Sequence, residues 1–420
     1  MRNGDNGAEP TDVLDHMKRI GETQAMASGH LRKDPTLWAI PVFFASIAAE
    51  RAWYRRHLGQ RDPSGGYEQR DTMASLSMGQ LSVIAPLVLP TLLRPLTPGR
   101  GRFGKALLGV AAASAAAAAG ADHGLRRRRR HVDLLRDTAA EDPTLMPDSV
   151  ESPSDRRLRF VQKLAGPVAM ATGGVAAATW LASAGSSDRM FAKRLLPDLG
   201  GGLVPFSLAM IGWDFLYYWS HRLQHEHRYL WSIHVVHHSS ERYNLSTALR
   251  QPIAESFGTM VPYGVLSLFG IRPALILKAR GVNLIWQFWI HTEVVRSLGL
   301  GEALLSTPSS HRVHHGANRR YLDRNHGGIL ILWDRIFGTF EPEVEQSRYG
   351  LTSNIETFSP AIIATHEYRA MFSDISQATS WGDRIRFAIG PPGWRPALGS
   401  GADPTLGSGI ADPGDPRVAA

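Results

Sequence analysis

Residues 72–93 read TMASLSMGQLSVIAPLVLPTLL, a run of 22 residues without a charged side chain. A second charge-free run of 24 residues, LAGPVAMATGGVAAATWLASAGSS, covers 164–187. About 20 apolar residues in an α-helix cross a hydrocarbon core of about 30 Å, so each run is long enough to span a membrane. The two runs therefore predict two membrane-spanning helices.

Shorter charge-free runs leave two alternatives open. They lie at 35–49, 106–121, 199–213, 256–271 and 281–292. Each could be a tilted or half-buried membrane helix, or a buried helix of a soluble core. The alanine-rich run 106–121 has basic residues on both sides, and both flanks cannot be cytosolic if it spans, so it could instead be re-entrant or interfacial. Together the runs argue against a wholly soluble protein.

The composition limits the chemistry. The 420 residues contain no cysteine, which excludes disulfides, iron–sulfur clusters, thiol nucleophiles and cysteine-bound zinc. Any metal must be held by His, Asp or Glu. The formal net charge is +8, and the excess gathers in clusters such as RRRRR at 126–130. Because such clusters lie beside apolar segments, they favour contact with a membrane surface over binding of nucleic acid.

Composition also divides the chain into parts. We expect disordered polar tails at 1–34 and 396–420, accessory membrane helices with a basic loop at 35–131, a polar linker at 132–159, and the functional membrane domain at 160–395. The first thirty residues lack the apolar segment of a signal peptide, so we expect a cytosolic N-terminal tail.

Histidines are concentrated in one part of the chain. Eleven of the 17 lie between 221 and 326. Their motifs are HRLQH at 221–225, HVVHH at 234–238 and HRVHH at 311–315, so the rings stand three or four residues apart. Residues at these spacings share one face of a helix, and each motif is predicted to direct its rings toward one point. The eight imidazoles are twice the four that one tetrahedral ion needs, which predicts two metal ions.

Metal binding has to be weighed against simpler explanations. A single histidine pair at helical spacing is more often a surface pair than a ligand set. Three motifs together favour metal, because protonated rings would repel one another and buried neutral rings would each need a partner. Imidazole suits zinc, copper, iron and nickel alike. The Glu-x-x-His pattern of carboxylate di-iron bundles and the HExxH of zinc proteases are both missing. His227 is expected to be structural or to support the ligands from outside the metal site.

The segments that contain these motifs resemble a known family. They are DFLYYWSHRLQHEHRYLWSIHVVHHSSERYNLSTALR (214–250), QFWIHT (287–292) and HRVHHGANRRYLDRNHGGILILWDRIFGTF (311–340). They are similar to the integral-membrane fatty acid hydroxylase and sterol desaturase superfamily. The later segments HEYRAMFSD (366–374) and WGDRIRFAIGPPGWRP (381–396) are similar to the branch that includes alkylglycerol monooxygenase.

The resemblance implies an all-helical membrane protein with a histidine-rich helical cap on the cytosolic side. A non-haem centre of two iron ions in that cap would use O2 to hydroxylate or desaturate a C–H bond of a fatty acyl, alkyl-glycerol or sterol lipid. An external reductant would be needed, either a cytochrome, a ferredoxin or tetrahydrobiopterin, and no nucleic acid is expected as partner. The alternative is a membrane zinc-binding or zinc-dependent hydrolytic protein without oxygen chemistry.

The resemblance also implies the metal ligands, residue by residue. The eight ligands of the motifs are His221, His225, His234, His237, His238, His311, His314 and His315, and His291 of QFWIHT matches a further histidine of the family pattern. His326 stands where many members have tyrosine, so it either adds a ligand or replaces a hydroxyl near the metal. Candidates to orient the ligands, or else to cap helices or form surface pairs, are Asp214, Asn244, Arg250, Asp323, Asn325 and Asp334.

Overall fold

The computed structural model describes residues 35–57, 63–139, 152–257 and 263–396. Within these ranges the regular structure is helical, apart from one isolated antiparallel bridge between Leu305 and Leu330. The predicted all-α class is therefore confirmed. The tails predicted to be disordered, 1–34 and 396–420, lie outside the described residues except for Pro396.

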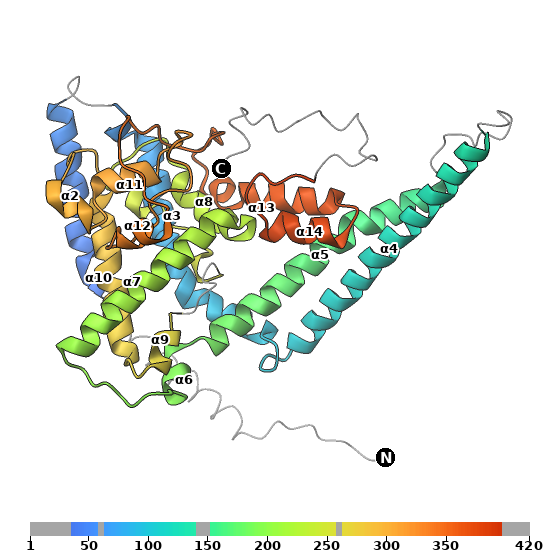
Figure 1. The fold of residues 1–420 in the computed structure, drawn as a ribbon, viewed down its shortest axis with the longest axis horizontal. Coiled ribbons are helices and arrows are strands. Elements are labelled where there is room, and N and C mark those ends of the chain that lie inside the picture. Colours follow the sequence, from blue (N-terminus) through green and yellow to red (C-terminus); the bar gives the residue numbers. More distant parts are fainter. Residues whose placement is uncertain (1–34, 58–62, 140–151, 258–262, 397–420) are drawn as a thin grey trace, which may run out of the picture.

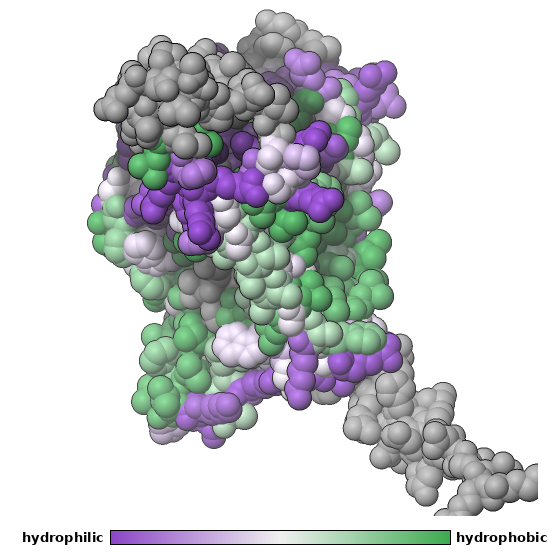
Figure 2. All heavy atoms as spheres, turned by 90° about the vertical axis from the view of Figure 1, so that its right-hand side faces the viewer, coloured by the Kyte–Doolittle hydropathy of each residue, from purple (hydrophilic) through white to green (hydrophobic). Residues whose placement is uncertain are grey.

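Three helices of the described part are long and apolar enough to cross a membrane. They are α3 (Gln69–Leu93), α4 (Gly104–Ala139) and α5 (Pro153–Ala184). The predicted spans 72–93 and 164–187 coincide with α3 and α5, and the run 106–121 is neither re-entrant nor a separate segment, because α4 continues through the arginines at 126–130. Figure 2 shows a hydrophobic band between two hydrophilic zones, as an integral membrane protein requires.

Helices α4 and α5 form a long antiparallel hairpin that projects away from the rest of the molecule (Figure 1). Their register is set by a hydrogen bond from Gln162 Nε2 to Asp122 Oδ1 of 2.8 Å and by an ion pair of 3.0 Å between Arg128 and Asp155. Ser152 caps α5 by accepting a hydrogen bond from the Asp155 backbone N–H.

The histidine motifs lie on a separate group of shorter helices. These are α7 (Leu203–Glu226), α8 (Arg228–His238), α10 (Pro273–Ile290) and α11 (Pro308–His314). His227 has extended backbone angles and ends α7. The next helix, α8, begins at Arg228 and packs back against α7. α2 (Pro35–Arg56) packs on α10, where the rings of Phe43 and Phe288 stack with centroids 4.1 Å apart.

Further short elements complete the described fold. The remaining α-helices are α6 (Ser187–Ala192), α9 (Val265–Leu268), α12 (Leu332–Phe337), α13 (Pro360–Gln377) and α14 (Trp381–Ile389). Short 3-10 helices are η1 (Pro63–Gly65), η2 (Arg94–Leu96), η4 (Thr247–Leu249), η5 (Glu255–Phe257) and η6 (Gly299–Ala303). α13 packs against both α8 and α5, and thereby joins the histidine-bearing helices to the hairpin.

The division of the chain into domains stays a prediction. α4 and α5 both extend into the expected linker 132–159, of which 140–151 lie outside the described residues. In the region expected to be accessory, α2 packs on α10 and α3 packs on α13 and η4. The histidine-bearing helices are therefore covered in part by helices that precede the expected functional domain.

Candidate metal centre

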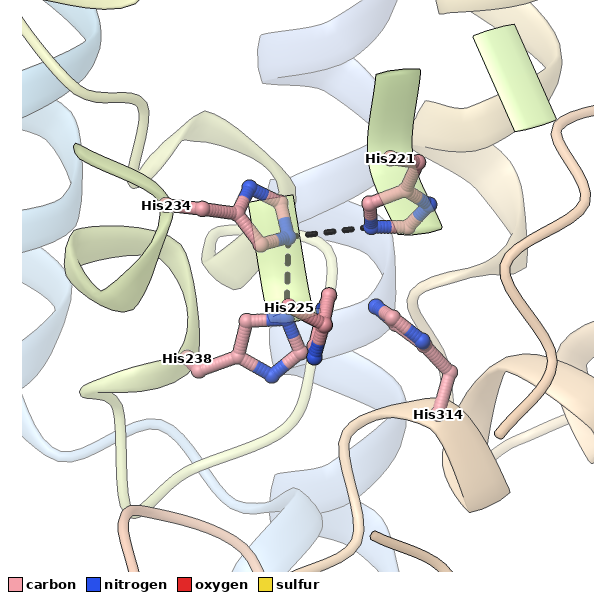
Figure 3. Close-up of side chains that lie close together, drawn as sticks. All are labelled: His221, His225, His234, His238 and His314. Carbon is pink, nitrogen blue, oxygen red and sulfur yellow. Dashed lines mark hydrogen bonds between the residues drawn. The ribbon is translucent and has the colours of Figure 1, made fainter. Parts of the chain in front are cut away.

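Nine histidines of the described part converge in two adjacent groups. In each group the potential ligand atoms lie within 4.8 Å of one another, and all nine side chains are buried. The first group contains His221, His225, His234, His238 and His314, and the second contains His237, His291, His311 and His315. Figure 3 shows the five rings of the first group facing a common centre. The groups touch where the rings of His238 and His315 stack, with centroids 4.4 Å apart.

The three rings of each H-x2-H-H motif do not converge on one site, so the prediction made from their spacing was wrong. On α8, His234 and His238 belong to the first group, whereas His237 belongs to the second. An α-helix turns by about 100° per residue, so residues four apart differ by about 40°, whereas His237 and His238 differ by about 100°. The motif at 311–315 divides in the same way, because His311 and His315 stay together and His314 joins the first group.

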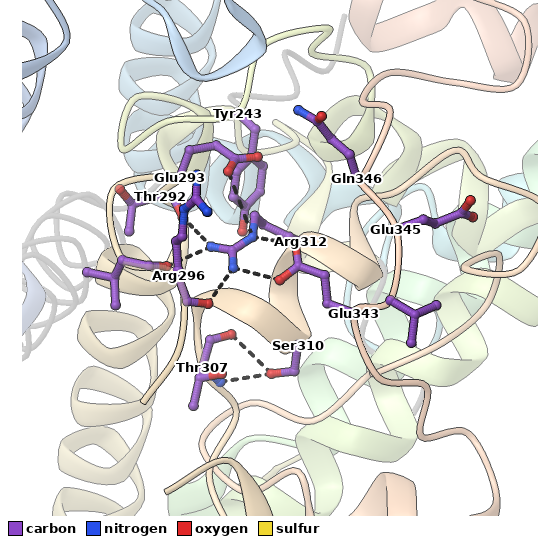
Figure 4. Close-up of polar contacts among 12 residues, drawn as sticks. Tyr243, Thr292, Glu293, Arg296, Thr307, Ser310, Arg312, Glu343, Glu345 and Gln346 are labelled. Atoms are coloured by element: carbon purple, nitrogen blue, oxygen red, sulfur yellow. Dashed lines mark hydrogen bonds and ion pairs between the residues drawn. The ribbon is translucent and has the colours of Figure 1, made fainter. Parts of the chain in front are cut away.

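Local sequence explains how α11 presents its rings. Pro308 occupies the first turn, where its missing N–H costs no hydrogen bond. Thr307 and Ser310 form a reciprocal capping box at this end of the helix (Figure 4). Arg312 then anchors the helix, because it donates to the backbone oxygens of 292, 295 and 296 and pairs with Glu343 at 2.6 Å.

Backbone carbonyls and one carboxylate hold the outer nitrogens of five rings. A carbonyl can only accept a hydrogen bond, so each Nδ1 that faces one must carry the proton, which leaves the Nε2 lone pair directed inward. The pairs are His221 with the carbonyl of His326 at 2.9 Å, His237 with Arg250 at 3.2 Å, His291 with Gln287 at 2.6 Å, His314 with Arg324 at 3.0 Å, and His225 with the Asp323 carboxylate at 3.3 Å. This arrangement is typical of metal-ligating histidines.

The second group shows most directly that a cation belongs there. Both His237 and His291 have a protonated Nδ1, yet their Nε2 atoms lie 3.1 Å apart, and His311 Nε2 lies 3.0 Å from His291 Nε2. Two lone pairs at this distance repel each other unless a positive charge lies between them. Nitrogens bound to one ion at about 2.1 Å, with bonds at right angles, are about 3.0 Å apart. The donor set therefore fits a metal ion.

Unsatisfied nitrogens support the same conclusion for the first group. His234 Nε2 lies 2.9 Å from His221 Nε2 and 3.1 Å from His238 Nε2, and a single N–H could serve only one of these contacts. Among the described residues, the Nε2 atoms of His225 and His314 are buried without a hydrogen-bond partner. Buried polar atoms without partners are costly, and a bound ion removes that cost.

Burial keeps the rings neutral and therefore able to bind metal. Desolvation lowers the pKa of His234, His238 and His311 well below the usual value of 6.5, and neighbouring histidines lower it further. Burial likewise lowers the pKa of His237 to about 4. Neutral imidazole is the metal-binding form, so at neutral pH the ligand atoms need not lose a proton before they bind.

We expect acid to destabilise the metal-free protein. A histidine whose pKa is lower in the folded state binds protons more readily when unfolded, so its contribution to stability is complete above the unfolded pKa and is lost as the pH falls through the folded value. For His237 this window extends from 6.5 down to about 4. Thermal unfolding of chelator-treated protein should therefore show a lower midpoint at about pH 5.5 than at about pH 7.5. An unchanged midpoint would contradict the neutral, buried state of these rings.

Comparison with known proteins agrees with this geometry. Residues 206–339 match the family model described as fatty acid hydroxylase, and these bounds enclose both histidine groups. This part of the chain is therefore similar to the fatty acid hydroxylase family. The resemblance to this superfamily that the histidine motifs predicted is therefore confirmed.

The relatives agree with the predicted alkylglycerol monooxygenase-like branch. The chain is 46% identical to alkylglycerol monooxygenase of Homo sapiens over 188 residues, which cover 45% of this chain and 42% of that protein. It is 44% identical to alkylglycerol monooxygenase of Danio rerio over 212 residues, which cover 50% and 47%. Ornithine lipid hydroxylase of Rhizobium tropici is 30% identical over 151 residues, 35% of this chain and 46% of that protein. The chain thus spans slightly less than half of these curated relatives, and no solved structure matches it.

His326 lies beside the first histidine group but does not belong to it. Its ring centroid is 5.0 Å from that of His225, and within the described residues neither ring nitrogen has a hydrogen-bond partner. The Asp334 carboxylate is 3.8 Å from Nδ1. Its role as a tenth ligand stays a prediction.

The residues expected to orient the ligands act in different ways. Asp323, in a left-handed backbone conformation, contacts His225 directly, and Arg250 orients His237 through its backbone carbonyl. The others stabilise the surrounding loops. Asp214 accepts from the backbone N–H groups of 329 and 330, Asp334 from those of 326 and 327, Asn325 from that of 341, and Asn244 from that of 246.

Two buried acids that support the histidine groups were not predicted from the sequence, and both precede the matched residues 206–339. Asp71 of α3 pairs with Arg250 Nη2 at 2.6 Å and accepts from Ser240 Oγ at 2.7 Å. Glu50 of α2 accepts from the Leu245 backbone N–H at 2.8 Å and from the hydroxyl of Thr292, the neighbour of His291. Each acid directly adjoins a charge-free run, 72–93 or 35–49, and a carboxylate at such a boundary was the available signal.

Proposed function

We propose that the protein is a membrane-bound non-haem di-iron oxygenase that hydroxylates, or desaturates, a C–H bond of a lipid with O2 and an external electron donor. The observation that carries the proposal is the pair of buried histidine groups in which protonated Nδ1 atoms face outward and Nε2 lone pairs face each other. Nine imidazoles in two groups match the ligand need of two ions, and the chain offers no thiolate in their place.

The relatives narrow the proposed substrate. The proteins to which this chain is similar are named alkylglycerol monooxygenase and ornithine lipid hydroxylase, and both names describe oxidation of a lipid. An alkyl-glycerol lipid is therefore the first substrate to test, ahead of fatty acyl and sterol lipids. The same names do not favour the zinc-dependent hydrolytic alternative.

The chain contributes the environment of the reaction. Two iron ions held by the histidine groups would supply the redox chemistry with dioxygen. Hydroxylation requires two electrons beyond those from the substrate, because one oxygen atom leaves as water, and the cysteine-free chain has no thiol or iron–sulfur centre to store them. We therefore propose a cytochrome, a ferredoxin or tetrahydrobiopterin as external reductant. The buried rings exclude bulk water from the centre, which we propose faces the cytosol.

Metal content and oxygen uptake test this proposal together. Protein purified in detergent from iron-supplemented cells is expected to contain close to two irons per chain. It should consume O2 only when a reductant and an alkyl-glycerol lipid are both present. Redox-inert zinc that iron cannot replace, without oxygen uptake, would contradict the oxygenase and favour the zinc alternative.

A further inference from the structure

The α4–α5 hairpin carries a dense band of positive charge beyond its apolar half. The band consists of the arginine run 126–130 on α4 and of Arg156, Arg157, Arg159 and Lys163 on α5, and we call it the basic collar. All nine side chains are exposed. They lie at one level because the helices are antiparallel: Arg128 pairs with Asp155, and Leu158 lies against Gly124.

The charge of the basic collar is poorly neutralised. The ion pair of Arg128 with Asp155 engages one of its cations. Within the described residues, Arg127, Arg129, Arg130, Arg156 and Arg157 make no ion pair. Asp122 is the nearest acid toward the apolar half, and it is buried in a bidentate pair with Arg384. As far as the structure describes the chain, the collar therefore presents five guanidinium groups that make no ion pair.

The position of the collar indicates the surface it faces. Immediately before it on α4, and after it on α5, lie the apolar stretches of two helices long enough to span a membrane. Those stretches expose large apolar side chains such as Leu108, Val110, Leu164 and Trp180. Figure 2 views the molecule from the side of the hairpin and shows the hydrophobic band ending at a hydrophilic zone. The collar thus lies at the level of lipid headgroups.

A second element is held at the same level. Arg384 of α14 reaches Asp122 of α4, and Arg126 donates to the Thr379 carbonyl just before α14. The helix α14 exposes Ile385 and Ile389, so it has the apolar and basic faces of a helix that lies in a membrane interface. The residue after its last turn contacts α8, because the Arg228 backbone N–H donates to the Gly390 carbonyl at 2.9 Å.

We propose that the basic collar binds anionic phospholipid headgroups of the leaflet that adjoins the histidine centre. Guanidinium groups match the phosphate oxygens of such lipids in charge and in paired hydrogen-bond geometry. An anionic headgroup seated on the collar neutralises charges that otherwise repel one another, such as those of Arg126 and Arg130, which are four residues apart on α4. Nucleic acid would satisfy the same charge but not the exposed apolar surface directly below it. Bound lipid would hold α14, and through it α8, against the membrane surface.

Lipid retention by the full-length protein tests the proposal. Purified protein is incubated in mixed micelles with equal amounts of phosphatidylglycerol and phosphatidylcholine, separated from free micelles, and its lipid is quantified. The parent should retain several-fold more phosphatidylglycerol, and this preference should fall steeply between about 0.1 and 1 M salt. A preference that is missing, or that persists in high salt, would overturn the proposal.

A matched pair of variants locates the site. One variant carries Arg127→Gln, Arg129→Gln, Arg130→Gln, Arg156→Gln and Arg157→Gln. The control removes five cations at the opposite end of the spans, with Arg100→Gln, Arg102→Gln, Lys105→Gln, Lys193→Gln and Arg194→Gln. The collar variant should retain the two lipids equally, and the control should behave as the parent. Equal loss in both would assign the preference to net charge, and loss in neither would exclude the collar. The salt titration of the parent decides independently of how either variant folds.

Discussion

His315→Ala is expected to remove one of the two metal ions and to lower lipid-dependent O2 consumption by at least about 100-fold, since even outer partners of metal ligands are worth 10- to 100-fold. His315 belongs to the second group, which has four histidines, so its loss leaves three nitrogens for that ion. Its ring also stacks on His238 of the first group, and its Nε2 is buried without a partner among the described residues. No neighbouring side chain of that group is placed to substitute for it.

Iron per chain and oxygen uptake, measured on the same preparation, check this expectation. His123→Ala is the matched control, because His123 is an exposed histidine on α4 outside both groups. The control should keep the metal content and the rate of the parent. A His315→Ala protein with two irons and the parental rate would exclude His315 as a ligand and with it the grouping described above.

Asp71→Ala is expected to destabilise the protein by about 3–5 kcal/mol, because it leaves the Arg250 guanidinium buried without its counter-charge. Arg250 is also bonded to Ser75 and Ser239, so the guanidinium cannot move out to solvent without breaking further hydrogen bonds. The backbone carbonyl of Arg250 orients His237. We therefore expect the second group to bind its ion about 10- to 100-fold more weakly in this variant.

Thermal unfolding and competition with a chelator measure the two effects. The double variant Asp71→Leu, Arg250→Met serves as comparison, since replacing both partners of a buried ion pair with apolar residues is often neutral. It should recover most of the stability that Asp71→Ala loses. An Asp71→Ala protein that unfolds at the parental temperature, or a double variant that is less stable than the single one, would show that the pair does not stabilise the fold.

Much of the fold follows from local pattern. Charge-free runs of sufficient length predicted α3 and α5, because crossing a hydrocarbon core depends only on length and apolar composition. Flanking charge misled the interpretation of 106–121. Its arginines belong to the same helix α4, whose basic end lies beyond the apolar stretch rather than in a separate loop. Arginine is a strong helix former, so the charged run continues α4 instead of ending it.

The sequence predicted the type of metal ligand, whereas the tertiary structure decided how the ligands are grouped. The absence of cysteine and the i, i+4 pairs 221/225, 234/238 and 311/315 predicted imidazole ligands that share a helix face, and each pair indeed stays in one group. Only the crossing of α7, α8 and α11 decided that His237 and His314 leave their own motifs for the opposite group.

The sequence by itself therefore determined a helical membrane protein and predicted imidazole ligands for two ions, since helix length and helix-face spacing are properties of neighbouring residues. Only the tertiary structure decided how the rings divide five to four, which carbonyls fix their protonation, and that Asp71 and Glu50 support them. Asp71 and Arg250 are 179 residues apart, and a contact at that separation depends on how whole helices pack rather than on any local period.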